Sequence, residues 1–202
     1  MGAGVIAVVD YKAGNLTSVM KALHVAGAKA VLTEDPDVVR RAVKIVLPGV
    51  GHFAATSFLA EHGLKEAIEE RIRAGAPFLG ICVGLQWLFA GSTEAPGYEG
   101  LSTFPQLCDR FAPGKKVPHV GWNSLAIREG SQLFAGIEDG SFVYFTHSYR
   151  APVINETAAV TNYDEPFTAA VERGNVMGVQ FHPEKSGAAG LHLLENFVRL
   201  AC

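Results

Sequence analysis

The first half of the sequence alternates short apolar runs with segments of helical periodicity, and this alternation restricts the possible folds most. Continuous apolar runs are typical of strands buried on both faces of a parallel sheet, and here they occupy residues 5–9, 28–32, 45–47 and 77–81. Helical spacing covers residues 16–26, 53–62, 64–74 and 83–90. Strands alternating with helices predict a parallel sheet with helices on both of its faces.

The second half has a different pattern, with short strand candidates that follow one another through turns. These candidates lie at residues 142–145, 158–163, 168–172 and 176–181, and an amphipathic helix is expected at 191–200. Consecutive strands joined by turns favour antiparallel pairing. We therefore predict one α/β domain over residues 1–202, with a flavodoxin-like mixed central sheet flanked by helices.

Composition excludes several classes of protein. The chain is 49% hydrophobic and 18% charged, its formal net charge is -3, and it has no basic stripe of the kind that binds nucleic acid. The apolar runs are too short to span a membrane. Cys82, Cys108 and Cys202 form an odd, sparse set without CxxC spacing, which argues against a disulfide scaffold or a zinc site. We expect a cytoplasmic protein without a metal or a cofactor.

The sharpest local feature is the segment Gly80-Ile81-Cys82-Val83-Gly84, which connects an expected buried strand to an expected helix. Glycine on both sides of a cysteine permits a turn too tight for side chains and lifts the thiol out at the carboxyl end of the strand. The helix that follows favours the thiolate, and the N–H of Val83 is positioned to donate to an oxyanion. Most cysteines at strand ends are small buried hydrophobes, and that interpretation suits Cys108 and Cys202.

A histidine and a carboxylate two residues apart follow the last strand candidate, at His182 and Glu184. Residues i and i+2 of an extended chain share one face, so the carboxylate can orient one ring nitrogen and leave the other free as a base. Pro183 keeps this spacing stiff. The pair alone could instead be structural or could ligate a metal, but no third ligand with suitable spacing accompanies it.

Taken together, these segments resemble the class I glutamine amidotransferases. The resemblance rests on PGVG at 48–51, GICVGLQ at 80–86 and GVQFHPEKSG at 178–187. Within that class the chain resembles the family of glutaminase subunits of imidazole glycerol phosphate synthase, which act in histidine biosynthesis. This closer likeness rests on DY and GNL between residues 10 and 16, on VPHVGWN at 117–123 and on YFTHSY at 144–149.

The resemblance implies a role for each matching residue. Cys82 would attack the side-chain amide of L-glutamine, His182 would take the thiol proton and return it to ammonia, and Glu184 would hold His182. The remaining residues of the implied site bind the substrate or complete the oxyanion hole through the backbone: Val50, Gly51, Val83, Gln86, Glu94, Ser148 and Tyr149. A peptide flip in the 48–51 loop would bring the N–H of Val50 to the oxyanion.

The resemblance also implies a heterodimer partner, a barrel-shaped synthase subunit that consumes the ammonia. Trp122, Asn123, Tyr144 and Lys185 match the side that faces this partner. We expect residues 121–123 to form a polar loop, in which Trp122 serves as an interface anchor. One departure from the family is Lys12, which stands where glycine is usual.

Three other functions fit parts of the sequence. The glutaminase subunit of anthranilate or aminodeoxychorismate synthase shares the class but not the 119–123 and 144–149 segments. A catalytically silent binding subunit would not need Cys82, His182 and Glu184 together. A cysteine peptidase could use the same triad, but Gln86 and Glu94 suit a free amino acid better than a polypeptide.

Overall fold

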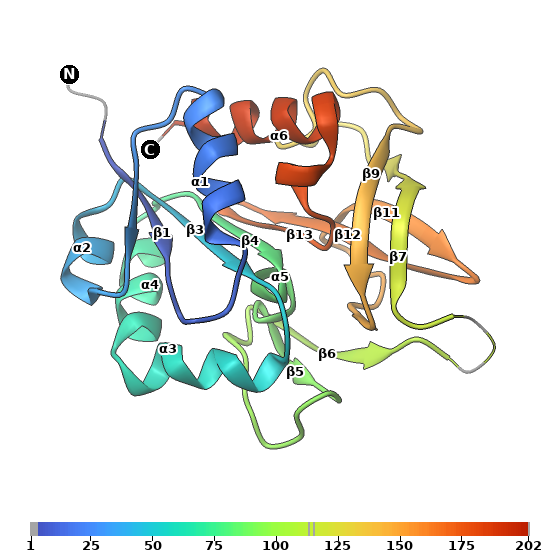
Figure 1. Ribbon diagram of the computed structural model, residues 1–202, viewed down its shortest axis with the longest axis horizontal. Coiled ribbons are helices and arrows are strands. Elements are labelled where there is room, and N and C mark those ends of the chain that lie inside the picture. Colours follow the sequence, from blue (N-terminus) through green and yellow to red (C-terminus); the bar gives the residue numbers. More distant parts are fainter. Residues whose placement is uncertain (1–3, 113, 115, 202) are drawn as a thin grey trace.

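A central eight-stranded sheet organises the molecule, whose computed structural model describes residues 4–112, 114 and 116–201 (Figure 1). The strand order is β2-β1-β3-β4-β13-β12-β11-β8, parallel as far as β13 and antiparallel from there on. The strands are β1 (Ile6–Val9), β2 (Ala30–Thr33), β3 (Lys44–Gly49), β4 (Phe78–Cys82), β8 (Ala126–Ile127), β11 (Thr157–Tyr163), β12 (Glu165–Arg173) and β13 (Val176–Val179). The expected mixed sheet is confirmed.

Helices cover both faces of this sheet, as the alternation predicted. One face is covered by α1 (Leu16–Val25) and α6 (Gly187–Arg199), and the other by α2 (Pro36–Arg41), α3 (Ser57–Glu61) and α4 (Leu64–Arg73). Strand β1 shows why the apolar runs are continuous: its side chains are buried on both faces of the sheet. Ile6 and Val8 join the hydrophobic core on the α1 side, whereas Ala7 and Val9 join the core on the α4 side.

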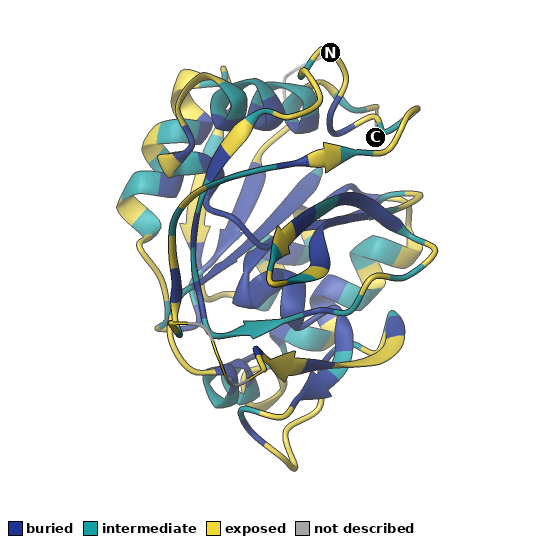
Figure 2. Cartoon of the chain, turned by 90° about the vertical axis from the view of Figure 1, so that its right-hand side faces the viewer, coloured by how far each residue is buried: buried dark blue, intermediate teal, exposed yellow. Residues whose placement is uncertain are grey.

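The remaining elements surround the carboxyl ends of the parallel strands. A three-stranded sheet has the order β10-β6-β5, and β7 pairs with β9 as an antiparallel ribbon. Their bounds are β5 (Phe89–Ser92), β6 (Phe104–Arg110), β7 (His119–Ser124), β9 (Phe142–His147) and β10 (Tyr149–Arg150), with short helices η1 (Phe53–Thr56), α5 (Val83–Gln86) and η2 (Pro183–Lys185). Figure 2 shows buried residues along the central strands and exposed ones mainly on the outer segments.

Two expectations about local structure were wrong. The helix predicted for residues 83–90 ends at Gln86, because the carbonyls of Trp87 and Phe89 accept hydrogen bonds from Leu101 and Ser102 and draw the chain into a strand. Residues 121–123 lie in β7 rather than in a loop. Only one face of the β7–β9 ribbon is buried, so its sequence is polar enough to resemble a loop.

Within the described ranges, no helix combines the length and the apolar character needed to cross a membrane.

Candidate active site

The cysteine elbow has the strained geometry that its flanking glycines predicted. Cys82 has φ +56°, a left-handed conformation that few non-glycine residues adopt. A side chain at Gly84 would place its Cβ only 1.9 Å from the carbonyl oxygen of Leu47, and one at Gly80 would lie 2.3 Å from the carbonyl oxygen of Gly84. Both positions therefore exclude any side chain, and the turn presents Cys82 at the end of β4.

The register of the parallel strands gathers the other expected residues around Cys82. Gly49 of β3 is paired with Cys82, and Val179 of β13 is paired with Ile81. The loop that follows β3 therefore lies on one side of the thiol, and the segment that follows β13 lies on the other. Ligands of open α/β sheets bind at such carboxyl ends.

His182 and Glu184 form a buried pair, in which Nδ1 of His182 lies 2.9 Å from Oε1 of Glu184. Both side chains are 1% exposed. The predicted contact is present, but not on a strand face, because β13 ends at Val179 and Glu184 belongs to the 3-10 turn η2. A carboxylate only accepts hydrogen bonds, so Nδ1 carries the proton. Nε2 of His182 has no hydrogen-bond partner among the described residues.

The surroundings of His182 favour its protonated form. Burial lowers its pKa, but Cys82 and Glu184 together raise it more, so that the pKa of His182 lies at about 9. Both neighbours act in the same direction, because a thiolate and a carboxylate each stabilise a positive imidazolium. The arrangement can therefore hold a proton taken from the Cys82 thiol and deliver it to a leaving group.

A pocket of about 240 Å³ opens beside Cys82. Its lining includes each residue that the family resemblance places at the substrate, and it adds three that sequence reasoning did not single out: Pro118, Thr146 and His147. The YFTHSY segment contains Thr146 and His147, but strand alternation alone does not tell which of its residues face a cavity. The described residues contain no group of three or more His, Cys, Asp or Glu side chains that could hold a metal.

Two of the expected substrate residues are already engaged in hydrogen bonds within the protein. Oε2 of Glu94 accepts from the backbone N–H of Phe53 at 2.8 Å, which fixes the carboxylate at the pocket wall. Nε2 of Gln86 donates to the carbonyl oxygen of Tyr149 at 3.0 Å and to Oε1 of Gln180 at 3.1 Å. Gln86 therefore also has a structural role, which the sequence did not indicate.

Three of the four residues expected to face a partner form one exposed group. Trp122 is 54% exposed, and its ring lies 6.1 Å from that of Tyr144 in an edge-on arrangement. Nζ of Lys185 lies 5.7 Å from the centre of the Tyr144 ring. Asn123 follows Trp122 on β7 and so points to the opposite face, where its Nδ2 donates to the carbonyl oxygen of Asn162 at 3.0 Å.

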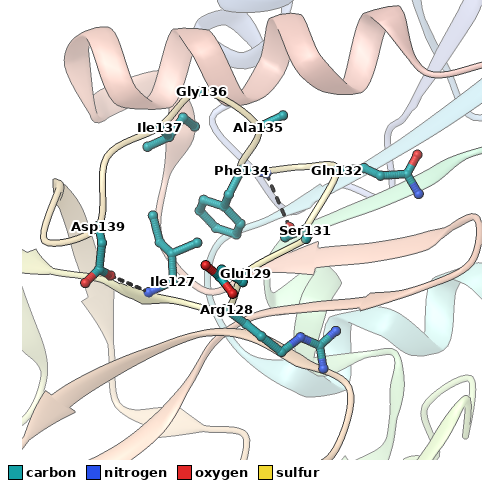
Figure 3. Close-up of a pocket in the computed structure, with 11 residues that line it drawn as sticks. Ile127, Arg128, Glu129, Ser131, Gln132, Phe134, Ala135, Gly136, Ile137 and Asp139 are labelled. Atoms are coloured by element: carbon teal, nitrogen blue, oxygen red, sulfur yellow. Dashed lines mark hydrogen bonds between the residues drawn. The ribbon is translucent and has the colours of Figure 1, made fainter.

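A second hollow is larger, about 540 Å³, and is lined by residues between Ile127 and Asp139 (Figure 3). Asp139 accepts a hydrogen bond from the backbone N–H of Ile127 at 2.7 Å, and Ser131 accepts one from that of Phe134 at 3.3 Å. Its lining contains no cysteine or histidine. The smaller pocket at Cys82 is the better candidate, because it alone of the two combines a nucleophile with a nearby base.

Comparisons with known proteins agree with this geometry. Residues 7–201 match the model of the family described as glutamine amidotransferase class-I. The chain is 49% identical over 196 residues to imidazole glycerol phosphate synthase subunit HisH of Methanothermobacter thermautotrophicus, covering 96% of this chain and 98% of that protein. It is 51% identical to the subunit of the same name from Thermococcus kodakarensis, covering 96% and 100% of the two chains.

Solved structures show the same fold at low sequence identity. A glutamine amidotransferase crystal structure superimposes with a TM-score of 0.76 at 20% identity, covering 96% of this chain and 99% of the other. The PurLQS structure from Thermotoga maritima has a chain that gives a TM-score of 0.75 at 18% identity, covering 96% and 97%.

Proposed function

Because this chain belongs to the class I glutamine amidotransferases, and within them to the imidazole glycerol phosphate synthase subunits, we propose that Cys82, His182 and Glu184 are its catalytic triad. The enzyme hydrolyses glutamine and supplies ammonia to a larger synthase. The observation that carries the assignment of residues is the juxtaposition of a strained cysteine elbow with a buried His182–Glu184 pair at one edge of the sheet.

In the proposed mechanism the Cys82 sulfur attacks the side-chain amide carbon of glutamine. His182 holds the thiol proton and donates it to the departing nitrogen. The nitrogen leaves as ammonia, and a thioester remains on Cys82. Neutral His182 then takes a proton from water, the water oxygen attacks the thioester, and glutamate leaves. Glu184 keeps Nδ1 protonated throughout and so directs Nε2 toward the reacting atoms.

The developing oxyanion requires backbone donors, which we assign to the N–H groups of Val83 and Val50. Val83 begins helix α5, where the first N–H groups have no partner within the helix. Val50 lies between Gly49 and Gly51, and Gly51 has φ +106°, so the loop already contains a backbone conformation that favours glycine. An oxyanion donor contributes about 3–4 kcal/mol to transition-state stabilisation.

L-Glutamine is the substrate that we assign to the 240 Å³ pocket. The Glu94 carboxylate suits the ammonium group of a free amino acid. We place Gln86, Gly51, Ser148 and Tyr149 around the same amino-acid end, because each lines the pocket beside Cys82. The relatives described above favour this synthase over anthranilate or aminodeoxychorismate synthase as the user of the ammonia.

The partner that we propose is a barrel-shaped synthase subunit, which docks on the exposed group of Trp122, Tyr144 and Lys185. An exposed tryptophan packed edge-on against a tyrosine is a typical interface anchor. Asn123 would contribute through the strand that carries Trp122 rather than by direct contact. We place the complex in the cytoplasm, where Cys82 and Cys108 remain free thiols.

Substitution of the nucleophile tests the triad. Cys82→Ala should lower glutamine turnover by at least about a thousandfold while the fold survives, because a nucleophile and its base act as a unit. Glutamate release in the presence of the synthase partner measures this. Cys108→Ala is the matched control, since Cys108 is buried away from the pocket and burial raises the pKa of its thiol. Turnover that persists in folded Cys82→Ala would remove Cys82 from the mechanism.

A further inference from the structure

Gln180 contacts the reacting sulfur but has no part in the mechanism described so far. It directly follows β13, beside the end of β4, and it is fully buried. Its Nε2 lies 3.6 Å from Sγ of Cys82, a hydrogen-bonding separation for the large sulfur atom, and its Oε1 accepts from Nε2 of Gln86 at 3.1 Å.

The orientation of the Gln180 amide follows from a backbone carbonyl. The carbonyl oxygen of Tyr149 can only accept, so the end of the Gln86 side chain that lies 3.0 Å from it is the amide nitrogen. That nitrogen has a second hydrogen, and the atom of Gln180 that faces it must be the oxygen. The nitrogen of Gln180 therefore faces Cys82, and the sulfur receives an N–H donor.

A pair of histidines holds the Tyr149 carbonyl from its other side. Nδ1 of His147 lies 2.9 Å from this oxygen and must donate to it. Burial lowers the pKa of His147 to about 3, so the ring is neutral and its Nε2 accepts from Nδ1 of His119 at 3.1 Å. The carbonyl oxygen of Tyr149 thus accepts from both His147 and Gln86, and His119 in turn donates to His147. These bonds fix the carbonyl on which the orientation of Gln180 depends.

We propose that Gln180 is a further catalytic residue, whose side-chain N–H stabilises the thiolate of Cys82 and holds the sulfur in position for attack. The inference rests on the proposed role of Cys82 as nucleophile. A thiolate needs hydrogen-bond donors, and Cys82 is only 4% exposed, so water contributes little. Hydrogen bonds to charged groups are stronger than those between neutral groups, so a single fixed donor has a measurable effect on the reactivity of the sulfur.

Alkylation of Cys82 by iodoacetamide tests this directly, in a Cys108→Ala, Cys202→Ser background and at a fixed, mildly alkaline pH. We compare the parent protein with Gln180→Leu and with Gln180→Met, which is close to glutamine in volume. Both variants are uncharged and have no side-chain N–H to donate to the sulfur. Gln106→Leu, on the exposed side of β6, is the matched control. In both Gln180 variants the alkylation rate should fall by at least about tenfold, and the ultraviolet absorbance of the thiolate should fall in parallel.

The same variants should lower kcat in the complex by about tenfold or more and change KM by less than about threefold, because the lost contact is to the nucleophile. A purely structural role, in which Gln180 only fills space beside Cys82, predicts that Gln180→Met alkylates at the rate of the parent protein. That result would overturn the proposal. Alkylation does not require turnover, so failure of the wild-type chain to hydrolyse glutamine would instead contradict the proposed function.

Discussion

At Cys82 the backbone has φ +56° and ψ -105°, a sparsely populated conformation that costs roughly 1–3 kcal/mol for a residue with a Cβ. Lys12 also has a positive φ of +63°, so the residue that replaces the glycine expected from the resemblance lies in strained backbone. The glycines around Cys82 indicated the first strained residue. The second was indicated only by the family resemblance, through the expected glycine, because lysine itself does not favour this region.

The charge of His182 depends on the two residues beside it, and removing one should change its pKa. In Cys82→Ala the pKa of His182 should fall below about 9, because burial, which lowers it, is then opposed mainly by Glu184. An NMR titration of the imidazole resonances measures this shift. If the pKa of His182 were unchanged, the proposed coupling between base and nucleophile would be wrong. His62, exposed and stacked on Phe58, serves as the internal reference.

At the scale of elements, much of the first half of the chain was predictable because β1, β3 and β4 are buried on both faces and its glycines mark the turns. The apolar run at residues 28–32 was wrongly expected to be buried on both faces: β2 is the edge strand, and its Val31 and Leu32 are exposed. The proposed triad followed from two short motifs, each placed after a strand. The β7–β9 ribbon and β5 were not predictable, because their conformation depends on pairing with distant segments. Gln180, His119 and His147 were missed as a network for the same reason: β7, β9 and β13 meet only in three dimensions.

The elbow packs so closely on β3 that one added methyl group should disrupt it. Gly84→Ala would place a carbon 1.9 Å from the carbonyl oxygen of Leu47, which is backbone and has little freedom to move. We expect a loss of about 2 kcal/mol or more in the free energy of unfolding, with glutaminase activity reduced at the same time. Gly91→Ala, whose nearest contact would be at 3.1 Å, is the milder comparison. Equal urea midpoints for the two variants would argue against a tight elbow.

The buried histidine pair joins two strands of the ribbon and should make the fold sensitive to acid. The folded pKa of His147 is about 3, below its ordinary value of 6.5, so between these pH values the unfolded state binds the extra proton. Stability is therefore lost as pH falls below 6.5, by about 1.4 kcal/mol per pH unit.

Urea unfolding at pH 7 and pH 5 measures this loss, and His147→Gln is the comparison. Wild type should lose about 2 kcal/mol more than His147→Gln over that interval. The same pH dependence in both proteins would show that His147 is not the buried group responsible.

At the scale of the whole molecule, the proposed catalytic edge and the exposed group at Trp122 lie close together. His182 and Lys185 are connected by the turn η2, and the backbone N–H of His182 donates to the carbonyl oxygen of Tyr144 at 2.9 Å. A partner that contacts Tyr144 would therefore contact strand β9, whose backbone also holds His182, the proposed base. The 48–51 loop offers a second route by which partner binding could affect catalysis, because rotation of the peptide that precedes Val50 would move its N–H group.

The central claim is that this chain is a glutaminase whose activity depends on its synthase partner. The most direct test is the rate of glutamate release from glutamine by the chain alone, with the synthase subunit, and with that subunit and its nucleotide substrate. We predict a low rate for the chain alone and a rise of at least about a hundredfold in the full complex. Such a rise corresponds to shifting the 48–51 loop from mostly inactive to mostly active, which takes about 5.5 kcal/mol of differential binding. Equal rates in all three mixtures would contradict the coupling, and no release in any of them would contradict the glutaminase itself.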